Sequence, residues 1–170
     1  GGAVALAIGW PVTVAGDASP NLIELYHAAQ AAPDAVAAQV AVQAFARPGE
    51  SGFYSLRDLY NAAKPNGAMR PDRAAMLLAL IRRCFNGVLR TNRAGGFNVP
   101  VGRKADGSIY DPAWPQAAEV LAAWADVARC WKFVCSDFAP IVDSAREGDV
   151  LMVDPPYATP DKEIRAGAMF

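Results

Sequence analysis

Aspartates stand at or just after the ends of three short apolar runs, PVTVAGD, WKFVCSDF and VLMVDPPY. β-Branched and aromatic residues in runs of this length are typical of buried strands, and helical stretches separate the runs. This alternation predicts an α/β domain with a largely parallel sheet. Ligands of such sheets bind outside the carboxyl ends of the strands, so Asp17, Asp137 and Asp154 are candidate ligand-binding residues.

Helical periods fill most of the remaining chain. Ser19 and Pro20 form a favourable helix start, because serine caps free backbone N–H groups and proline suits the first turn. Residues 85–108 lack a helical period and are rich in Gly, Asn and Arg, which predicts an irregular hairpin with its tip at residues 94–96. Helices are predicted over 2–9, 19–30, 33–46, 55–63, 71–84 and 113–130, with a short helix from residue 139.

The helical and hairpin middle interrupts the strand–helix alternation seen at both ends of the chain. We therefore predict a core formed by residues 1–30 and 112–170, with residues 31–111 inserted between two of its strands. At 170 residues and 53% hydrophobic content, the chain is long enough for one domain with a substantial core. No apolar run approaches the roughly 20 residues of a membrane-spanning helix, so no membrane contact is expected.

The cysteines and the histidine give no metal-binding pattern. Cys84, Cys130 and Cys135 are odd in number and lack a CxxC spacing, and His27 is the only histidine. We expect buried, reduced thiols rather than a zinc site or a disulfide, with no metal bound. Reduced thiols suit a cytoplasmic protein.

Basic residues concentrate in the middle of the chain, although its net charge is −1. Residues 57–104 hold ten Lys or Arg and two acids, whereas the remainder holds six bases and fifteen acids. A basic segment of this kind is either a phosphate-binding surface or a set of solvated helix faces, and charge alone does not separate the two.

The tetrapeptide Asp154-Pro155-Pro156-Tyr157 combines a carboxylate, a rigid backbone and an aromatic ring at one predicted strand end. The Asp154 carboxylate and a backbone carbonyl can together accept both hydrogens of an exocyclic amino group on a base. The prolines fix this acceptor pair in space, and Tyr157 offers a face for stacking. A base reaches such a site only after leaving the DNA stack, so the tetrapeptide predicts chemistry on a flipped base.

With these motifs the chain resembles the Dam-like, D12-class DNA adenine-N6 methyltransferases, which use S-adenosylmethionine. GDASPNLIELY is similar to the family's acidic second motif, FVCSDF to its third, and FNGVLRTNRAGGFNVPVGR to its DNA-recognition hairpin, in the family's order. The resemblance implies a Rossmann-like methyltransferase sheet with an inserted helical and hairpin DNA-recognition region. It also implies S-adenosylmethionine as cofactor, double-stranded DNA as partner, and methyl transfer to a flipped adenine in a short, GATC-like site.

The resemblance assigns residues to three roles. The catalytic motif is Asp154, Pro155, Pro156 and Tyr157. The cofactor-binding residues are Gly1, Gly2, Asp17, Asp137, Phe138 and Asp154. The DNA-contact positions are Phe85, Asn86, Val88, Arg90, Asn92 and Pro100, and the phosphate-contact positions are Arg93, Arg103 and Lys104. Arg90 and Asn92 suit guanine and adenine respectively, and Phe85 keeps an aromatic wedge where close relatives carry tyrosine.

Two alternatives stay open beside this interpretation. The same chemistry could act on cytosine or on a protein amide, although related enzymes for those often carry Asn or Ser in place of Asp154. Alternatively, the chain is a non-catalytic remnant that only binds DNA. The family's segment before the first strand, and its helices and strands after DPPY, have no counterpart here. We therefore expect a piece of a longer protein that lacks part of the cofactor pocket.

Overall fold

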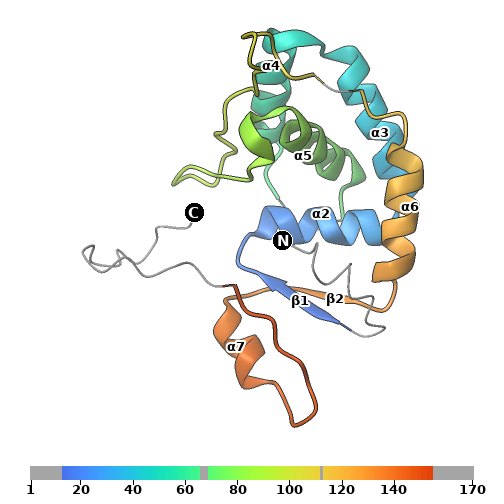
Figure 1. Ribbon diagram of the computed structural model, residues 1–170, viewed down its shortest axis with the longest axis vertical. Helices are drawn as coiled ribbons and strands as arrows, with labels where there is room; N and C mark the ends of the chain where they lie inside the picture. The colour runs from blue at the N-terminus through green and yellow to red at the C-terminus, as the bar shows by residue number, and fades with distance from the viewer. Residues whose placement is uncertain (1–12, 66–68, 112, 155–170) are drawn as a thin grey trace.

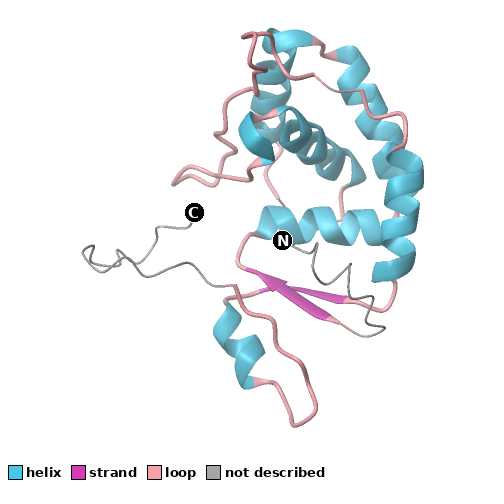
Figure 2. Cartoon of the chain, viewed as in Figure 1, coloured by secondary structure: helices cyan, strands magenta, loops and turns pink. Residues whose placement is uncertain are grey.

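A computed structural model describes residues 13–65, 69–111 and 113–154 of the chain. The helices are α2 (Pro20–Ala31), α3 (Pro33–Ala46), α4 (Gly49–Ala62), α5 (Pro71–Arg83), the 3-10 turn η1 (Phe85–Gly87), α6 (Ala117–Ala128) and α7 (Phe138–Asp143). The strands are β1 (Val14–Asp17) and β2 (Lys132–Cys135). Helices thus dominate the described residues, and the strand pair lies below α2 (Figures 1 and 2).

The two strands are parallel neighbours, although α2 to α6 separate them in the sequence. Val14 pairs with Lys132 at one end, and Asp17 pairs with Cys135 at the carboxyl end. Figure 1 shows α2 over one face of the pair and α7 on the other. The predicted α/β class with parallel pairing is therefore confirmed in this coarse form.

Packing on the two faces of the strand pair explains two features of the sequence. On the α2 face, the Phe133 ring lies 5.1 Å from the Tyr26 ring and 5.7 Å from the Trp124 ring, measured between centroids. On the α7 face, a Cβ on Gly16 would collide with Cδ1 of Ile141. A glycine in β1 therefore lets α7 approach the strand closely.

Helix starts follow the predicted signals except in α4 and α6, and α6 begins at Ala117 rather than at residue 113. The Ser19 side chain accepts a hydrogen bond from the N–H of Leu22 at 3.4 Å, and Pro20 opens the helix, as predicted. Helix α4 begins at Gly49 rather than at residue 55. The N–H of Gly49 donates to Oδ2 of Asp111 at 3.0 Å, so a remote carboxylate satisfies one free donor of the first turn.

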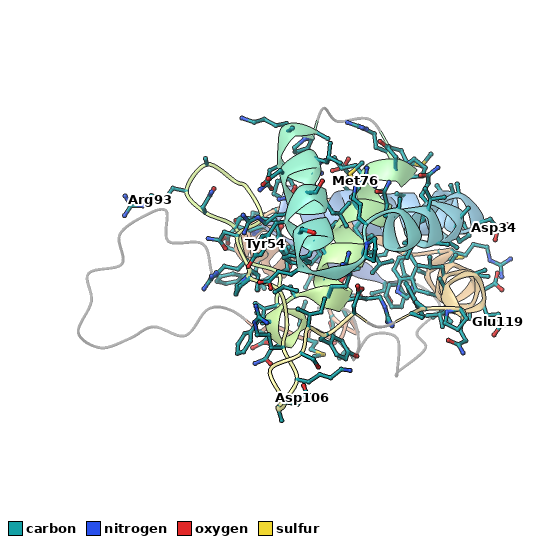
Figure 3. All side chains as sticks on the ribbon, turned by 90° about the horizontal axis from the view of Figure 1, so that it is seen from above. Asp34, Tyr54, Met76, Arg93, Asp106 and Glu119 are labelled. Atoms are coloured by element: carbon teal, nitrogen blue, oxygen red, sulfur yellow. The ribbon has the colours of Figure 1, made fainter. Side chains whose placement is uncertain are left out.

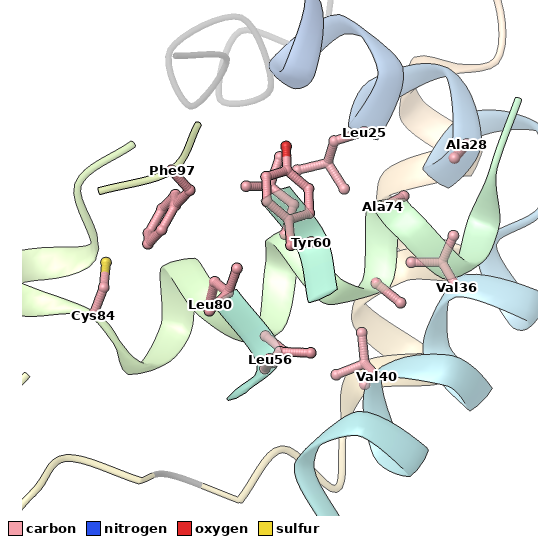
Figure 4. Packing of buried hydrophobic residues seen from close by; sticks show 14 of the residues in the cluster. Leu25, Ala28, Val36, Val40, Leu56, Tyr60, Ala74, Leu80, Cys84 and Phe97 are labelled. Carbon is pink, nitrogen blue, oxygen red and sulfur yellow. The ribbon is translucent and has the colours of Figure 1, made fainter. Parts of the chain in front are cut away.

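The main hydrophobic core lies among the helices (Figure 4). Leu56 of α4 and Leu80 of α5 are completely buried, and Phe97 of the hairpin is 1% exposed. Each such side chain stabilises the fold by about 1.5–3 kcal/mol through burial. Leu25 of α2 and Leu121 of α6 belong to the same cluster. The core thus joins helices on both sides of the predicted boundary near residue 31.

The third predicted strand is wrong over its described part. Residues 150–154 are assigned no strand, and the two-stranded sheet contains only β1 and β2. Val150 is 66% exposed and Met152 is 60% exposed. A strand needs a neighbour for its backbone hydrogen bonds, and among the described residues this apolar run has none. The predicted helix at 2–9 lies outside the described residues.

The prediction of three buried thiols is wrong for two of them. Cys84 is buried, whereas Cys130 and Cys135 are exposed, and all three are free. Cys130 lies in the turn after α6, and Cys135 ends β2 at the open edge, so neither is covered by a second layer.

In the described chain, no helix has the length and apolar character needed to cross a membrane.

Candidate active site and nucleic-acid interface

The parallel strands bring two of the predicted aspartates to one edge. Asp17 ends β1, and its carbonyl accepts from the N–H of Ser136 at 3.1 Å, one residue before Asp137. Oδ1 of Asp17 accepts from the N–H of Ser19 at 2.7 Å, and Oδ1 of Asp137 accepts from the N–H of Ala139 at 2.9 Å. Each carboxylate keeps its second oxygen free of described partners. Two free carboxylate oxygens at strand ends fit the ribose hydroxyls of a nucleoside cofactor.

An aromatic cluster supports this edge from within. Tyr26 stacks on Trp124 with the ring centroids 5.7 Å apart and the planes at 23°. Burial raises the pKa of the Tyr26 hydroxyl, and the nearby Asp17 carboxylate raises it further. The hydroxyl therefore stays protonated at neutral pH, and the cluster adds no negative charge beneath the strand end.

The remaining residues of the predicted catalytic and cofactor groups are placed only in part. Phe138 is the first residue of α7 and is 48% exposed, directly after Asp137. Asp154 is exposed, and it follows the apolar run that forms no strand. Outside the described residues lie Gly1, Gly2, Pro155, Pro156 and Tyr157.

The predicted DNA-contact residues all face solvent. Phe97, Val99 and Val101 of the same segment are buried in the core, which leaves one face of the hairpin outward. Figure 3 shows Arg93 projecting from the hairpin beyond the body of the molecule. The exposed set is Phe85, Asn86, Val88, Arg90, Asn92, Arg93, Pro100, Arg103 and Lys104.

Asn92 and Arg90 have different tasks within the hairpin. Oδ1 of Asn92 accepts from the N–H groups of Ala94 and Gly96, each at 3.0 Å, so this side chain builds the predicted tip. Bidentate contact with adenine needs that same oxygen. In this structure the oxygen is used to form the turn. Nε of Arg90 donates to Oδ1 of Asn98 at 2.9 Å. This bond orients the guanidinium and leaves its two terminal NH2 groups without a described partner.

Asn61 fixes the hairpin to α4, a role that the sequence did not reveal. Its Nδ2 donates to the carbonyl of Phe97 at 3.1 Å, and its Oδ1 accepts from the N–H of Phe97 at 2.8 Å. An isolated Asn in a helix carries no local signal for such a contact, because its partner lies 36 residues away.

Two arginines of the basic middle are neither solvated nor free for DNA. Arg73 is 3% exposed and Arg83 is 2% exposed. Arg73 pairs with Glu24, and Nε of Arg83 lies 2.8 Å from Oδ1 of Asp111. Both interpretations of the basic segment are therefore wrong for these two residues: Arg73 joins α5 to α2, and Arg83 joins α5 to the loop that contains Asp111.

Arg103 also has a partner on the surface. Its Nη2 donates to both carboxylate oxygens of Glu50, at 2.7 and 2.8 Å, and both side chains are about half exposed. A phosphate contact by Arg103 would compete with this exposed ion pair.

No group of three or more His, Cys, Asp or Glu in the part that the structure describes could hold a metal ion.

Comparison with known proteins gives a consistent set of relatives. The family described as D12 class N6 adenine-specific DNA methyltransferase matches residues 1–164. A "DNA N-6-adenine-methyltransferase" of Escherichia phage P1 is 32% identical over 92% of this chain and 20% of its own length. A "DNA adenine methylase" of Serratia marcescens is 38% identical over 62% of this chain and 35% of its own. The "Retron Ec67 DNA adenine methylase" of Escherichia coli is 28% identical over 91% of this chain and 51% of its own length. The chain thus spans about half or less of each relative.

Proposed function

Because this chain belongs to the D12 class N6 adenine-specific DNA methyltransferase family, we propose that it transfers a methyl group from S-adenosylmethionine to N6 of an adenine flipped out of double-stranded DNA. The observation that carries the proposal is the convergence of Asp17 and Asp137 at the carboxyl edge of two parallel strands. The outward face of the hairpin supports the DNA part of the proposal. The three free thiols suit the reducing cytoplasm, where we place the protein.

The cofactor site in this proposal is built from the strand ends. Asp17 and Asp137 bind the hydroxyl groups and the base of the nucleoside, and Phe138 packs beside them. Gly1 and Gly2 let the backbone approach the cofactor closely. S-adenosylmethionine supplies a methyl group attached to a positively charged sulfur.

The catalytic motif then acts on the amino group of adenine. The Asp154 carboxylate and the carbonyl of Pro155 accept its two hydrogens, which favours a lone pair on nitrogen directed at the methyl carbon. Pro156 fixes the backbone, and Tyr157 stacks on the base. As the nitrogen–carbon bond forms, the carbon–sulfur bond breaks, and the nitrogen then loses one proton to solvent.

The outward face of the hairpin reads the target in this proposal. Arg90 binds guanine through its free NH2 groups, and Phe85 fills the gap that the flipped adenine leaves. Arg93, Arg103 and Lys104 contact phosphates and set the position of the protein on the duplex. The target is a short, GATC-like sequence, also contacted by Asn86, Val88, Asn92 and Pro100.

The test is a methyl-transfer assay on the full-length protein with radiolabelled S-adenosylmethionine and a mixed-sequence duplex. We expect the label in N6-methyladenine. Asp154→Asn should lower the rate by roughly 10²–10³-fold, as loss of an oriented polar group in a catalytic site does, and should retain cofactor binding in part. Asp126→Asn is the matched control, because Asp126 is exposed on α6 with no described partner.

The assay also separates the alternatives. Labelled methyl groups found on cytosine or on protein would show that the acceptor is not adenine. Duplex binding without cofactor binding or transfer would identify a DNA-binding remnant. Equal loss of cofactor binding and transfer in Asp154→Asn would show that this residue maintains the fold and is not catalytic.

A further inference from the structure

A pocket of approximately 440 Å³ opens between the end of α5, the η1 turn and the loop that follows the hairpin. Its volume lies within the roughly 300–1,000 Å³ range of small-ligand sites. None of the predicted catalytic or cofactor residues lines it. The residues that matter for its chemistry are Arg82, Cys84, Phe85, Asn86, Gly102 and Tyr110.

The backbone around the pocket is closely fitted. Gly102 donates its N–H to the carbonyl of Arg83 at 2.7 Å, and a Cβ on Gly102 would lie 2.9 Å from the carbonyl oxygen of Cys84. Only glycine allows this approach without displacing backbone. Asn86 adopts a left-handed φ of 53°, which turns the chain at the rim.

Three of the last four carbonyls of α5 are already hydrogen-bonded. The N–H of Cys84 donates to the carbonyl of Leu80 at 2.8 Å, and its thiol donates to the carbonyl of Ile81 at 3.3 Å. The carbonyl of Arg83 accepts from Gly102. Free acceptors of a helix end would repel an anion, and here these partners satisfy three of them.

Two arginines, Arg82 and Arg103, line this pocket, and Arg82 is the one without an ion pair to a described residue. Its guanidinium lies 4.3 Å from the centroid of the Trp114 ring, which holds it in place. Its Nε is buried without a hydrogen-bond partner, and it forms no ion pair with a described residue. The neighbouring Arg83 pairs with Asp111, and Arg103 pairs with Glu50. A planar guanidinium with unused N–H groups matches the oxygens of a phosphate.

We infer that this pocket binds one phosphodiester group of the DNA, with Arg82 as its cation. Phe85 and Asn86 line the pocket and belong to the outward face of the hairpin. A duplex bound to that face therefore brings one of its phosphates to the mouth of the pocket. Tyr110, which is 45% exposed, offers an apolar wall for the attached sugar. The inference rests on the proposed function.

The test measures duplex binding by the full-length protein at a series of salt concentrations, using fluorescence anisotropy. Removing one phosphate contact lowers the slope of log K against log salt by about 0.9. We expect this decrease in Arg82→Gln, and a wild-type slope in Arg82→Lys, which keeps the charge. Arg57→Gln is the control, since Arg57 also lies over an aromatic ring, 4.6 Å from Tyr54, but does not line the pocket.

An unchanged slope in Arg82→Gln, with duplex binding by the wild type, overturns the inference and leaves the proposed function intact. An equal decrease in Arg57→Gln also overturns it, because the effect is then not local to the pocket. Failure of the wild type to bind any duplex refutes the proposed function itself. Titration of inorganic phosphate at constant ionic strength tests the other source: Arg82-dependent phosphate binding without a change in the DNA slope assigns the pocket to a free phosphate compound.

Discussion

The substitution Arg73→Met should lower the free energy of unfolding more than any single substitution at the surface of the protein. Arg73 lies in α5, and its guanidinium reaches α2, where it pairs with Glu24 and donates to Oδ1 of Asn21 at 2.7 Å. The guanidinium also lies 4.3 Å from the centroid of the Tyr60 ring in α4. One buried side chain therefore connects three helices.

The expected magnitude follows from burial of the partner. The Glu24 side chain is 10% exposed, so removing Arg73 leaves a carboxylate in the protein interior without its cation. Breaking a buried pair in this way costs about 3–5 kcal/mol. Burial already raises the pKa of Glu24, and Arg73 opposes that rise. Without Arg73 the pKa rises further, so the loss of stability should be greater at neutral pH than at acid pH.

Urea unfolding measures the change, with Glu50→Gln as the control for an exposed pair. The Arg103–Glu50 pair is about half exposed, and such pairs contribute roughly 0.2–1 kcal/mol. A second substitution, Glu24→Gln, removes the orphaned charge and should restore part of the stability of Arg73→Met. If Arg73→Met costs no more than Glu50→Gln, the reasoning from burial is refuted.

Asp72→Asn should lower the free energy of unfolding by up to about 1 kcal/mol at neutral pH, because the hydrogen bond from Arg70 holds the pKa of the Asp72 carboxyl below its ordinary value. That contribution is fully present above the ordinary pKa of Asp, about 3.9, and is lost as the pH falls below it and through the lowered pKa of the folded state, so thermal unfolding of variant and wild type should converge in acid. Arg90→Ala should relax sequence preference by about 1–3 kcal/mol at one base, and Arg103→Ala should weaken binding to all sequences. Methylation of a panel of singly altered target duplexes distinguishes the two, and uniform weakening by both would show that neither side chain reads a base.

Much of the local structure was predictable because its signals act over short distances. Ser19 and Pro20 start α2, and Pro33 and Pro71 start α3 and α5, at the predicted positions. The hairpin tip also forms at the Gly-rich turn, where Gly95 has a φ of +78°. The resemblance to the D12 class methyltransferases, seen in four short motifs, is confirmed by the family match over residues 1–164.

Burial and pairing were decided by contacts between distant segments. Arg73 and Arg83 are read in the sequence as part of a basic stretch, yet the partners that bury them lie 49 and 28 residues away. The run at 150–153 has the composition of a strand, but a strand exists only where a neighbour accepts its hydrogen bonds. Likewise, nothing near Arg82 in the sequence separates it from Arg83.

The sequence by itself determined where helices begin, where the chain turns, and which family the chain belongs to, because capping, backbone preference and motif order are encoded in adjacent residues. Only the tertiary structure decided which cations are available to DNA. It buries Arg73 and Arg83 beside carboxylates, and it leaves Arg82 without an ion pair among the described residues. The reason is physical: an arginine is free or engaged according to the carboxylates and rings that folding brings to it, and these lie in other segments of the chain.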